Sequence, residues 1–269
     1  MRGVSAETRE AVLAVVDQQV RDGADAASLG DDLFAVVGVL DAQPALRRML
    51  TNPSSSSDAK NGLVARLFDS KIGAPAFEAL GAAASGRWNG TRDFADALED
   101  AGVEAHLAGA ERSGDLESAE DELLRFSRVV HGDPALRAAL SDRTMSVARK
   151  RELVGALLEK RALSATVSLV KQAVAARRRA FELTLEDYVE VAAARRNQLV
   201  ATVRAAYDLD LDQRERLANA LQGLYGKPVH INVVVEPSLL GGATIEVGGE
   251  VIDSSVSGRL EQARRKMAG

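Results

Sequence analysis

Glycine and serine pairs near the C-terminus are the residues whose types and spacing come closest to a chemical site. Gly241-Gly242 and Gly248-Gly249 invite comparison with a phosphate-binding loop, and Asp253 followed by Ser254-Ser255 has the order of an acid beside a nucleophile. Neither glycine pair has the GxxxxGKS/T or GxGxxG spacing, and neither opens directly onto a helix. No histidine or lysine near Asp253 could serve as a base. We therefore predict that the glycines form turns and that a serine caps a helix.

Histidines and acidic residues give no metal or catalytic site either. His106, His131 and His230 are far apart, and the chain has no cysteine, which excludes disulfides, thiolate nucleophiles and cysteine zinc sites. The acidic run Glu120-Asp121-Glu122 is expected in the first turn of a helix, where negative charge offsets the helix dipole. The sequence thus predicts no catalytic residue, no metal and no cofactor.

Composition predicts a folded, mostly helical protein. Of 269 residues, 46% are hydrophobic and 27% charged, which is ordinary for a globular core, and only 4% are aromatic, which suits closely packed thin helices. The net charge of −5 argues against a nucleic-acid-binding protein. Neither a long apolar run nor a signal-peptide pattern is present, so we expect the chain to stay on the cytoplasmic side.

From about residue 197 the pattern is that of a small α/β domain. The helix in it is expected to bury Leu217, Leu221 and Leu224 and to end at Gly226, which suits a left-handed residue. The second strand is expected to bury Val229, Ile231, Val233 and Val235. The predicted order is a strand over residues 200–206, a helix capped by Asp210 or Asp212, a strand over residues 229–235, a hairpin of residues 244–247 and 250–252, and a helix from Ser254 or Ser255.

The preceding residues have the apolar periodicity of helices. We expect one helix over residues 7–21 and another from about Ser28, with Asp31 and Asp32 in its first turn. Pro44 suits position N1 of a short helix over residues 45–50, and the serine-rich segment 51–57 is interpreted as a loop between helices.

A repeat of 90 residues relates two helical segments. Residues 44–47 match residues 134–137, and Lys60 matches Lys150, without a gap. Because two unrelated alanine-rich helices would slip in register, we interpret the match as a duplication. Each copy is expected to form a bundle of five or six helices, and the last helix of the first copy can run straight into the first helix of the second.

The predicted fold is therefore mainly α: two tandem helical bundles followed by a small C-terminal α/β domain, with boundaries at residues 1–103, 104–196 and 197–269. The sharpest basic run is Arg177-Arg178-Arg179. We interpret it as satisfying carbonyl groups at a helix C-terminus, with a phosphate or an acidic partner as the alternative. Trp88 is expected to pack between helices, with a ligand platform as the alternative.

The C-terminal sequence resembles the signature of a known family. Residues 236–242 read EPSLLGG, and residues 251–260 read VIDSSVSGRL after Val247-Gly248. Together they look like the C-terminal motif of the delta subunit of F-type ATP synthase, the OSCP family, in which Asp-Gly-Ser-Val precedes Arg-Gly-Arg-Leu. Ser254 and Ser257 replace the glycine and the first arginine of that motif. The resemblance covers residues 104–269, and the first copy looks like the N-terminal duplicate of long bacterial delta subunits and b-delta fusions.

This resemblance implies a non-catalytic stator subunit of the F1Fo ATP synthase, which prevents F1 from turning with the rotor. The implied partners are the N-termini of the F1 alpha subunits and a peripheral-stalk b subunit or b-delta-type partner, not nucleic acid. The implied location is the cytoplasmic face of the plasma membrane, peripheral, with membrane contact only through the complex. By family analogy a groove between the first and fifth helices of the second copy binds an alpha N-terminus, and the candidate contact residues are Leu107, Val167, Val170 and Val174. Core packing is the alternative for all four.

Two other classes of protein stay open. A free-standing helical adaptor or nucleic-acid-associated factor would use the basic residues 177–179 and 264–266, with affinity for RNA that falls steeply with salt. An enzyme acting through the glycine-rich turns would need a ligand bound there. Co-purification with F1 would exclude the free-standing factor.

Overall fold

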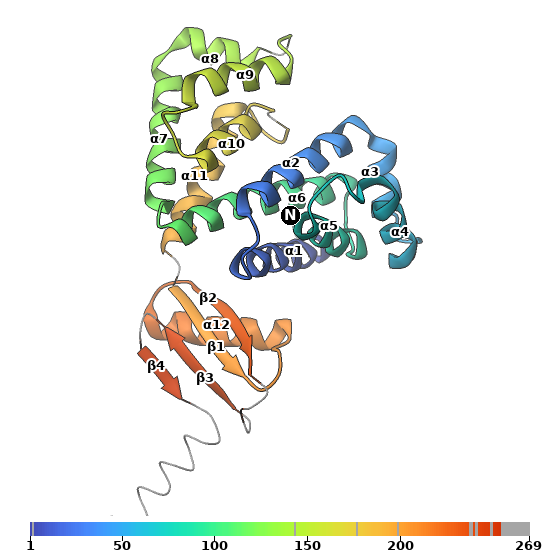
Figure 1. Cartoon of the computed structure of the whole chain (residues 1–269), viewed down its shortest axis with the longest axis vertical. Helices are drawn as coiled ribbons and strands as arrows, with labels where there is room; N and C mark the ends of the chain where they lie inside the picture. Colours follow the sequence, from blue (N-terminus) through green and yellow to red (C-terminus); the bar gives the residue numbers. More distant parts are fainter. Residues whose placement is uncertain are drawn as a thin grey trace, which may run out of the picture. The chain divides into compact units, whose positions relative to one another are not determined.

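The computed structural model divides into two compact units, Met1–Ala193 and Ala194–Gly269. It describes residues 1–253 except 2, 143, 176, 198, 237–238, 240–241 and 248–249. The first unit is built of helices, and the second of a small sheet with a helix (Figure 1). The predicted fold class, mainly α with a small C-terminal α/β domain, is confirmed.

The helical unit follows the predicted order of helices. A proline begins the third helix of each repeat at its N-terminal end, as predicted for Pro44 and as seen again at Pro134. The helices are α1 (Val4–Arg21), α2 (Ala26–Ala42), α3 (Pro44–Thr51), α4 (Ser57–Phe68), α5 (Ala74–Ser85), α6 (Thr91–Ser113), α7 (Leu116–Gly132), α8 (Pro134–Ser141), α9 (Val147–Leu158), α10 (Ser164–Ala173) and α11 (Phe181–Asn197).

The 90-residue repeat is confirmed helix by helix. Helices α2, α3 and α4 begin and end 90 residues before α7, α8 and α9, and α5 begins 90 residues before α10. Ser56 and Ser146 cap α4 and α9 in the same way, by accepting a hydrogen bond from the backbone N–H three residues on. Ser70 and Lys160, again 90 residues apart, both have a positive φ, of 58° and 67°. The two copies therefore share their turns as well as their helices.

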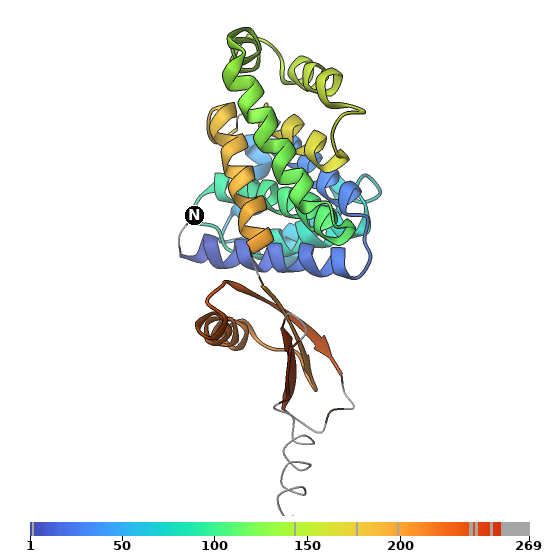
Figure 2. The same ribbon diagram turned by 90° about the vertical axis from the view of Figure 1, so that its left-hand side faces the viewer.

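The two repeats share helix α6, which runs without interruption from Thr91 to Ser113 (Figure 1). Its first half packs in one hydrophobic core through Phe94 and Leu98, and its second half packs in another through Leu107. The expected boundary between residues 103 and 104 falls inside this helix, and the domain limits stay a prediction. In the second core α7 and α11 lie side by side (Figure 2), where the rings of Phe126 and Phe181 meet edge to face with centroids 6.4 Å apart.

Trp88 packs against the first core between α5 and α6. Its ring meets Phe94 edge to face at 5.7 Å, and its Nε1–H donates a hydrogen bond to the carbonyl of Ala83 at 2.9 Å. The indole thus fills space between helices while its polar atom is satisfied.

Acidic residues that we assigned to the first turns of α2 and α7 lie farther along these helices, and that prediction is wrong. α2 begins at Ala26 with Asp25 as its N-cap, and its first turn contains no acidic residue. Asp32 instead accepts a hydrogen bond of 2.7 Å from Gly73 N–H, at the start of α5. Its counterpart Glu122 accepts one of 2.9 Å from Leu163 N–H at the start of α10. Each acid therefore satisfies another helix's N-terminus, which only the packing of helices reveals.

The C-terminal unit is a four-stranded sheet in the order β2-β1-β3-β4. β1 and β2 are parallel with Ala201 opposite Ile231, and β1 and β3 are antiparallel with Val203 opposite Ile245. Asp210 and Gln213 form a capping box at the start of the helix, and Gly226 ends it in the left-handed conformation with φ 67°. The elements are β1 (Leu199–Ala205), α12 (Leu211–Tyr225), β2 (Val229–Val235), β3 (Ala243–Val247) and β4 (Glu250–Asp253).

The predicted order of elements in this unit is confirmed up to β4, but the prediction that Leu224 and Val235 are buried is wrong. Leu221 and Ile231 are buried, whereas Leu224 is 67% exposed and Val235 is 49% exposed. A periodic pattern identifies the apolar face of an element, but it does not tell how far along the element that face is covered. The predicted turn at Gly248-Gly249 and the predicted helix after Asp253 lie outside the described residues.

Candidate partner-binding site

The four residues predicted to bind a partner lie on or next to α6 and α10, and all are buried. Leu107, Val170 and Val174 are at most 1% exposed and belong to the second core, and Val167 is 8% exposed. In this structure they pack between helices, which is the alternative that the sequence left open. Their partner-binding role stays a prediction.

Helix α2 of the first repeat packs along α6 and also contacts α10 (Figure 1). The ring of Phe34 on α2 belongs to the second core and stacks on His106 of α6, with ring centroids 5.4 Å apart. A helix of the same chain therefore lies against the two helices to which the family analogy points.

Glycines allow α2 and α6 to approach this closely. A Cβ atom on Gly30 of α2 would lie 2.5 Å from the imidazole of His106, and one on Gly102 of α6 would lie 2.5 Å from the ring of Phe34. Contacts this short do not occur between real atoms, so any larger residue would push the helices apart. The two repeats are therefore fitted to each other at these positions.

A polar contact also crosses between α2 and α6. His106 is buried, and its Nε2 lies 3.2 Å from Asp31 Oδ1. This contact lowers the pKa of Asp31 below its ordinary value, because it stabilises the ionised carboxylate. Nothing in the sequence spacing pairs these residues, which are brought together by helix packing.

The basic run 177–179 binds acids of the same chain, which corrects our expectation that it satisfies carbonyls at a helix C-terminus. α10 ends at Ala173, before the run begins. Arg177 Nη1 lies 2.7 Å from Glu99 Oε2 and 3.2 Å from Asp96 Oδ1, both on α6. Arg177 Nη2 also donates to Asp41 of α2 at 3.0 Å. Burial acts to lower the pKa of Arg177, but its pKa is raised because these carboxylates more than offset that effect.

The two following arginines are paired as well. Arg178 Nη2 lies 2.6 Å from Asp100 Oδ1 on α6. Arg9 Nε of α1 lies 2.5 Å from the other carboxylate oxygen of Asp100, Oδ2. Arg179 pairs with Asp187 of α11 at 2.5 Å, with both side chains well exposed. Asp100 thus joins a basic residue from each repeat.

Glu99 is the centre of this ion-pair cluster, between Arg177 and Arg178, and is not among the residues predicted from the sequence. Its side chain is 2% exposed, and it accepts hydrogen bonds from Gln172 Nε2 at 2.9 Å and from Tyr188 OH at 3.2 Å. Burial and the charge of Glu99 both raise the pKa of Tyr188. One signal could have identified it: the repeat places Val189 at the position equivalent to Glu99. An acid where the other copy has valine indicates a polar role inside the protein.

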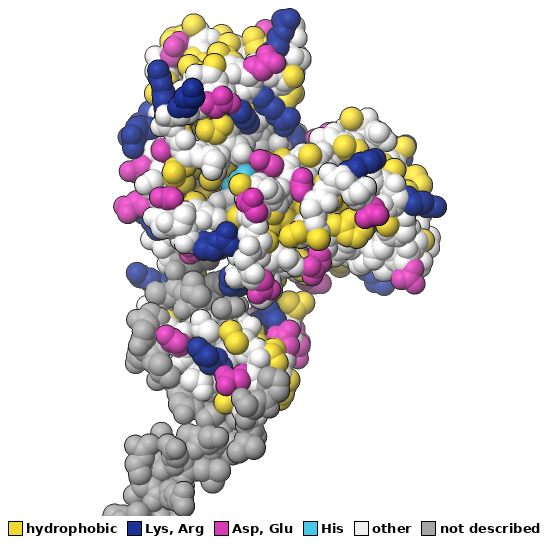
Figure 3. All heavy atoms as spheres, viewed as in Figure 1, with side chains coloured by type: hydrophobic (Ala, Val, Ile, Leu, Met, Phe, Trp, Pro, Cys, Tyr) yellow, Lys and Arg dark blue, Asp and Glu magenta, His cyan; other side chains and the backbone are white. Residues whose placement is uncertain are grey.

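The arrangement is suited to holding the repeats together rather than to chemistry. Over the described part of the chain, no group of three or more histidine or acidic residues could hold a metal ion. Acidic and basic side chains are interspersed over the visible face of the helical unit (Figure 3). No helix among the described residues combines the length and the apolar character needed to cross a bilayer.

Comparisons with known proteins give the family of this chain. The model of the family "ATP synthase delta (OSCP) subunit" matches residues 91–267, which begins at helix α6 and excludes most of the first repeat. Relatives that cover both repeats are each described as "ATP synthase subunit delta". One from Kineococcus radiotolerans is 47% identical over 99% of this chain and 98% of its own length. Others are from Nocardioides sp., 45% identical over 100% and 98% of the two chains, and from Streptomyces avermitilis, 44% identical over 99% and 97%. The chain therefore belongs to the ATP synthase delta (OSCP) subunit family, in a long form with a duplicated helical domain.

Proposed function

We propose that this chain is a non-catalytic stator subunit of an F1Fo ATP synthase, which links F1 to the peripheral stalk so that F1 does not turn with the rotor. The observation that carries this proposal is the match of the chain over its full length to relatives described as ATP synthase subunit delta. The subunit is peripheral, on the cytoplasmic face of the plasma membrane, and reaches the membrane only through the complex.

The helical unit binds the N-termini of F1 alpha subunits, and the C-terminal domain, predicted at residues 197–269, binds the ends of b subunits or a b-delta-type partner. Holding two partners at once raises the effective concentration of each for the other, so a firm link does not need a catalytic site. The two repeats either engage different alpha N-termini, or the first repeat contacts a b chain.

A matched pair of exposed residues supports equivalent binding surfaces on the two repeats. Val39 on α2 is 39% exposed, and Val129, at the equivalent position on α7, is 55% exposed. Leu107, Val167, Val170 and Val174 are buried between helices, so an alpha N-terminus would reach them only if those helices moved apart. Surfaces that are already exposed require no such opening.

Pulling down the tagged full-length chain tests the proposal, because F1 and the b subunit should both be recovered. Recovery of neither would refute it. Since the chain has no cysteine, a single cysteine at Val39 or at Val129 then reports contacts of each repeat by crosslinking. Crosslinks to alpha from both positions indicate that each repeat binds an alpha subunit, and a crosslink from Val39 to b indicates the other arrangement.

Deleting residues 1–103 tests the binding role of the first repeat less clearly than crosslinking does. That deletion divides helix α6 and removes Phe34, Asp41 and Glu99, which pack or pair with the second repeat. A loss of function would then reflect damage to the second repeat as well.

The nucleic-acid alternative loses its main support. Arg177, Arg178 and Arg179 are all engaged with carboxylates of the chain and are therefore not available to phosphates. The other basic run, residues 264–266, lies outside the described residues.

A further inference from the structure

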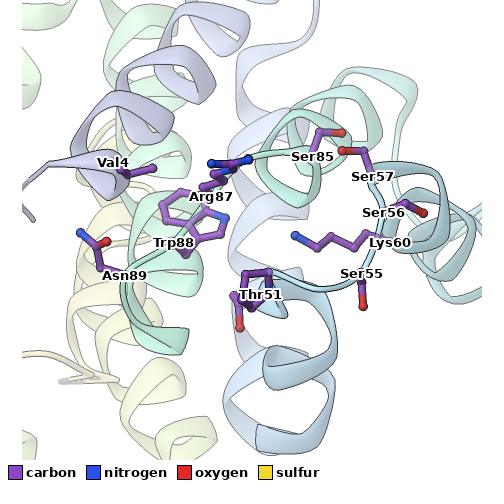
Figure 4. Close-up of a pocket in the computed structure, with 12 residues that line it drawn as sticks. Val4, Thr51, Ser55, Ser56, Ser57, Lys60, Ser85, Arg87, Trp88 and Asn89 are labelled. Carbon is purple, nitrogen blue, oxygen red and sulfur yellow. The ribbon is translucent and has the colours of Figure 1, made fainter.

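A pocket of about 510 Å³ lies in the first repeat, between the loop that precedes α4 and the loop that joins α5 to α6 (Figure 4). Its volume is in the range of small-molecule sites. Two lining residues are basic, Lys60 and Arg87, and none of the lining residues is acidic. The lining is therefore electropositive.

Lys60 is the residue that most needs an explanation. It is 6% exposed, and its side chain extends into the pocket toward Trp88 and Thr51 (Figure 4). Among the described residues, its ammonium group has neither a hydrogen bond nor an ion pair. Burial, and then the charge of Arg87, lower its pKa below the ordinary value. Because the side chain is mostly withdrawn from water while its ammonium reaches the pocket, an anion bound there would stabilise the charged form of Lys60.

The N-terminus of α4 faces the same pocket. Ser55, Ser56 and Ser57 line it, and Ser56 caps the helix by accepting a hydrogen bond from Ala59 N–H. The backbone N–H of Ser57 has no acceptor among the described residues. Free amides at a helix N-terminus, with hydroxyl groups beside them, favour an oxyanion.

The second repeat provides an internal comparison. Lys150 is equivalent to Lys60 and equally buried at 6%, but Asp142 replaces Asn52 in the loop before the helix. Hydrogen bonds from Thr144, and to a lesser extent the charge of Lys150, lower the pKa of Asp142. Arg177, which is equivalent to Arg87, is paired with Glu99. Carboxylates therefore lie near both basic residues of the second repeat, those at Arg177 being supplied by α2 and α6. Among the described residues, Lys60 and Arg87 of the first repeat have no ion pair.

We propose that the pocket of the first repeat binds a phosphate group, held by Lys60, Arg87 and the N-terminus of α4. A compact ammonium, helix amides and hydroxyl groups fit a tetrahedral oxyanion. The phosphate is either the free ion or part of a phosphate ester, for whose organic portion the volume beside Trp88 leaves room. This site includes none of the candidate contact residues on α6 and α10 and no residue of the C-terminal unit, so phosphate binding can be measured on the isolated chain whether or not the stator proposal holds.

Trp88 is the only tryptophan and lines the pocket, so its fluorescence reports binding directly. Inorganic phosphate added to the full-length chain at constant ionic strength should produce a saturable change, and chloride should not. Lys60→Met should weaken the apparent affinity by about tenfold or more. Lys150→Met, a matched buried lysine, should leave it unchanged. Phosphate should also raise the midpoint of thermal unfolding of the wild type and of Lys150→Met, but not of Lys60→Met.

Adenosine monophosphate distinguishes the two sources of phosphate. Tighter binding than that of the inorganic ion identifies an ester as the ligand, and equal binding identifies the ion. The proposal is overturned if phosphate and the ester produce no saturable change, if folded Lys60→Met binds as the wild type does, or if only an aspartate-rich peptide changes the fluorescence. The last result would mean that the pocket receives a protein segment.

Discussion

Arg177 Nη1 lies 2.7 Å from Glu99 Oε2, so a basic residue that follows α10 is paired with a buried acid on the helix shared by the two repeats. Because Arg177 also binds Asp41 of α2, the pair belongs to a cluster that connects the first repeat to the second. Glu99 also has Arg178 Nε 3.0 Å from Oε2, so Arg177 is one of two cationic partners of this buried carboxylate. Removing a cation from a buried cluster is unfavourable, and the stability of the helical unit should therefore depend on this arginine.

Replacing this arginine tests the cluster. Arg177→Met should lower the free energy of unfolding by about 2 kcal/mol, because Glu99 and Asp96 lose a cationic partner in a buried place while Arg178 still compensates Glu99. Urea denaturation followed by Trp88 fluorescence measures the change. Arg179→Met is the control, since its pair with Asp187 is exposed and should contribute less than about 1 kcal/mol. Equal losses in the two variants would contradict the assignment.

Alanine substitutions at two glycines of α2 distinguish the effect of close helix packing on stability from the effect of helix propensity. Gly30→Ala should destabilise the chain by about 1–3 kcal/mol, because the new methyl group would lie 2.5 Å from His106. In the same helix, the atom added by Gly38→Ala meets none of the described residues within 4 Å, so this substitution should instead stabilise the chain by up to about 1 kcal/mol. Thermal unfolding of both variants gives the comparison. A stabilising Gly30→Ala would show that α2 does not pack this closely on α6.

The contact between Asp31 and His106 should make stability depend on pH. The pKa of Asp31 is lowered in the folded chain, so its contribution is present above the unfolded value of about 3.9 and is lost as the pH falls through the folded value. Asp31→Asn should therefore be less stable than the wild type near neutral pH, and the difference should shrink below about pH 4. Urea midpoints measured from pH 3 to pH 7 provide the test. A difference that is the same at every pH would rule out this linkage.

The capping box of α12 should affect the C-terminal unit alone. Asp210→Ala removes the side chain that accepts from Gln213 N–H and should destabilise that unit by about 1 kcal/mol. Circular dichroism should show part of the thermal transition moving to lower temperature. Trp88 lies in the other unit, so its fluorescence transition should not move. A shift in the Trp88 transition would indicate that the two units unfold together.

The partner-binding site shows where prediction from sequence ends. Leu107, Val167, Val170 and Val174 have the apolar character that both a groove and a core require, and composition cannot distinguish the two. Burial of all four, and the presence of α2 against α6 and α10, became visible only in the structure. The three arginines show the same limit, because a basic run reveals a charge but not which acids lie opposite it.

The sequence by itself determined the duplication, the order of elements up to β4, a cap at Asp210 or Asp212, the helix end at Gly226 and the family. These features depend on residues a few positions apart or on direct similarity, so they can be read along the chain. Only the tertiary structure decided that Phe34 enters the second core, that Glu99 is buried beside two arginines and that Lys60 has no hydrogen-bond or ion-pair partner in the part of the chain that is described. The physical reason is distance along the chain: the bond between Arg177 and Asp41 joins residues 136 positions apart, and no local pattern specifies such a contact.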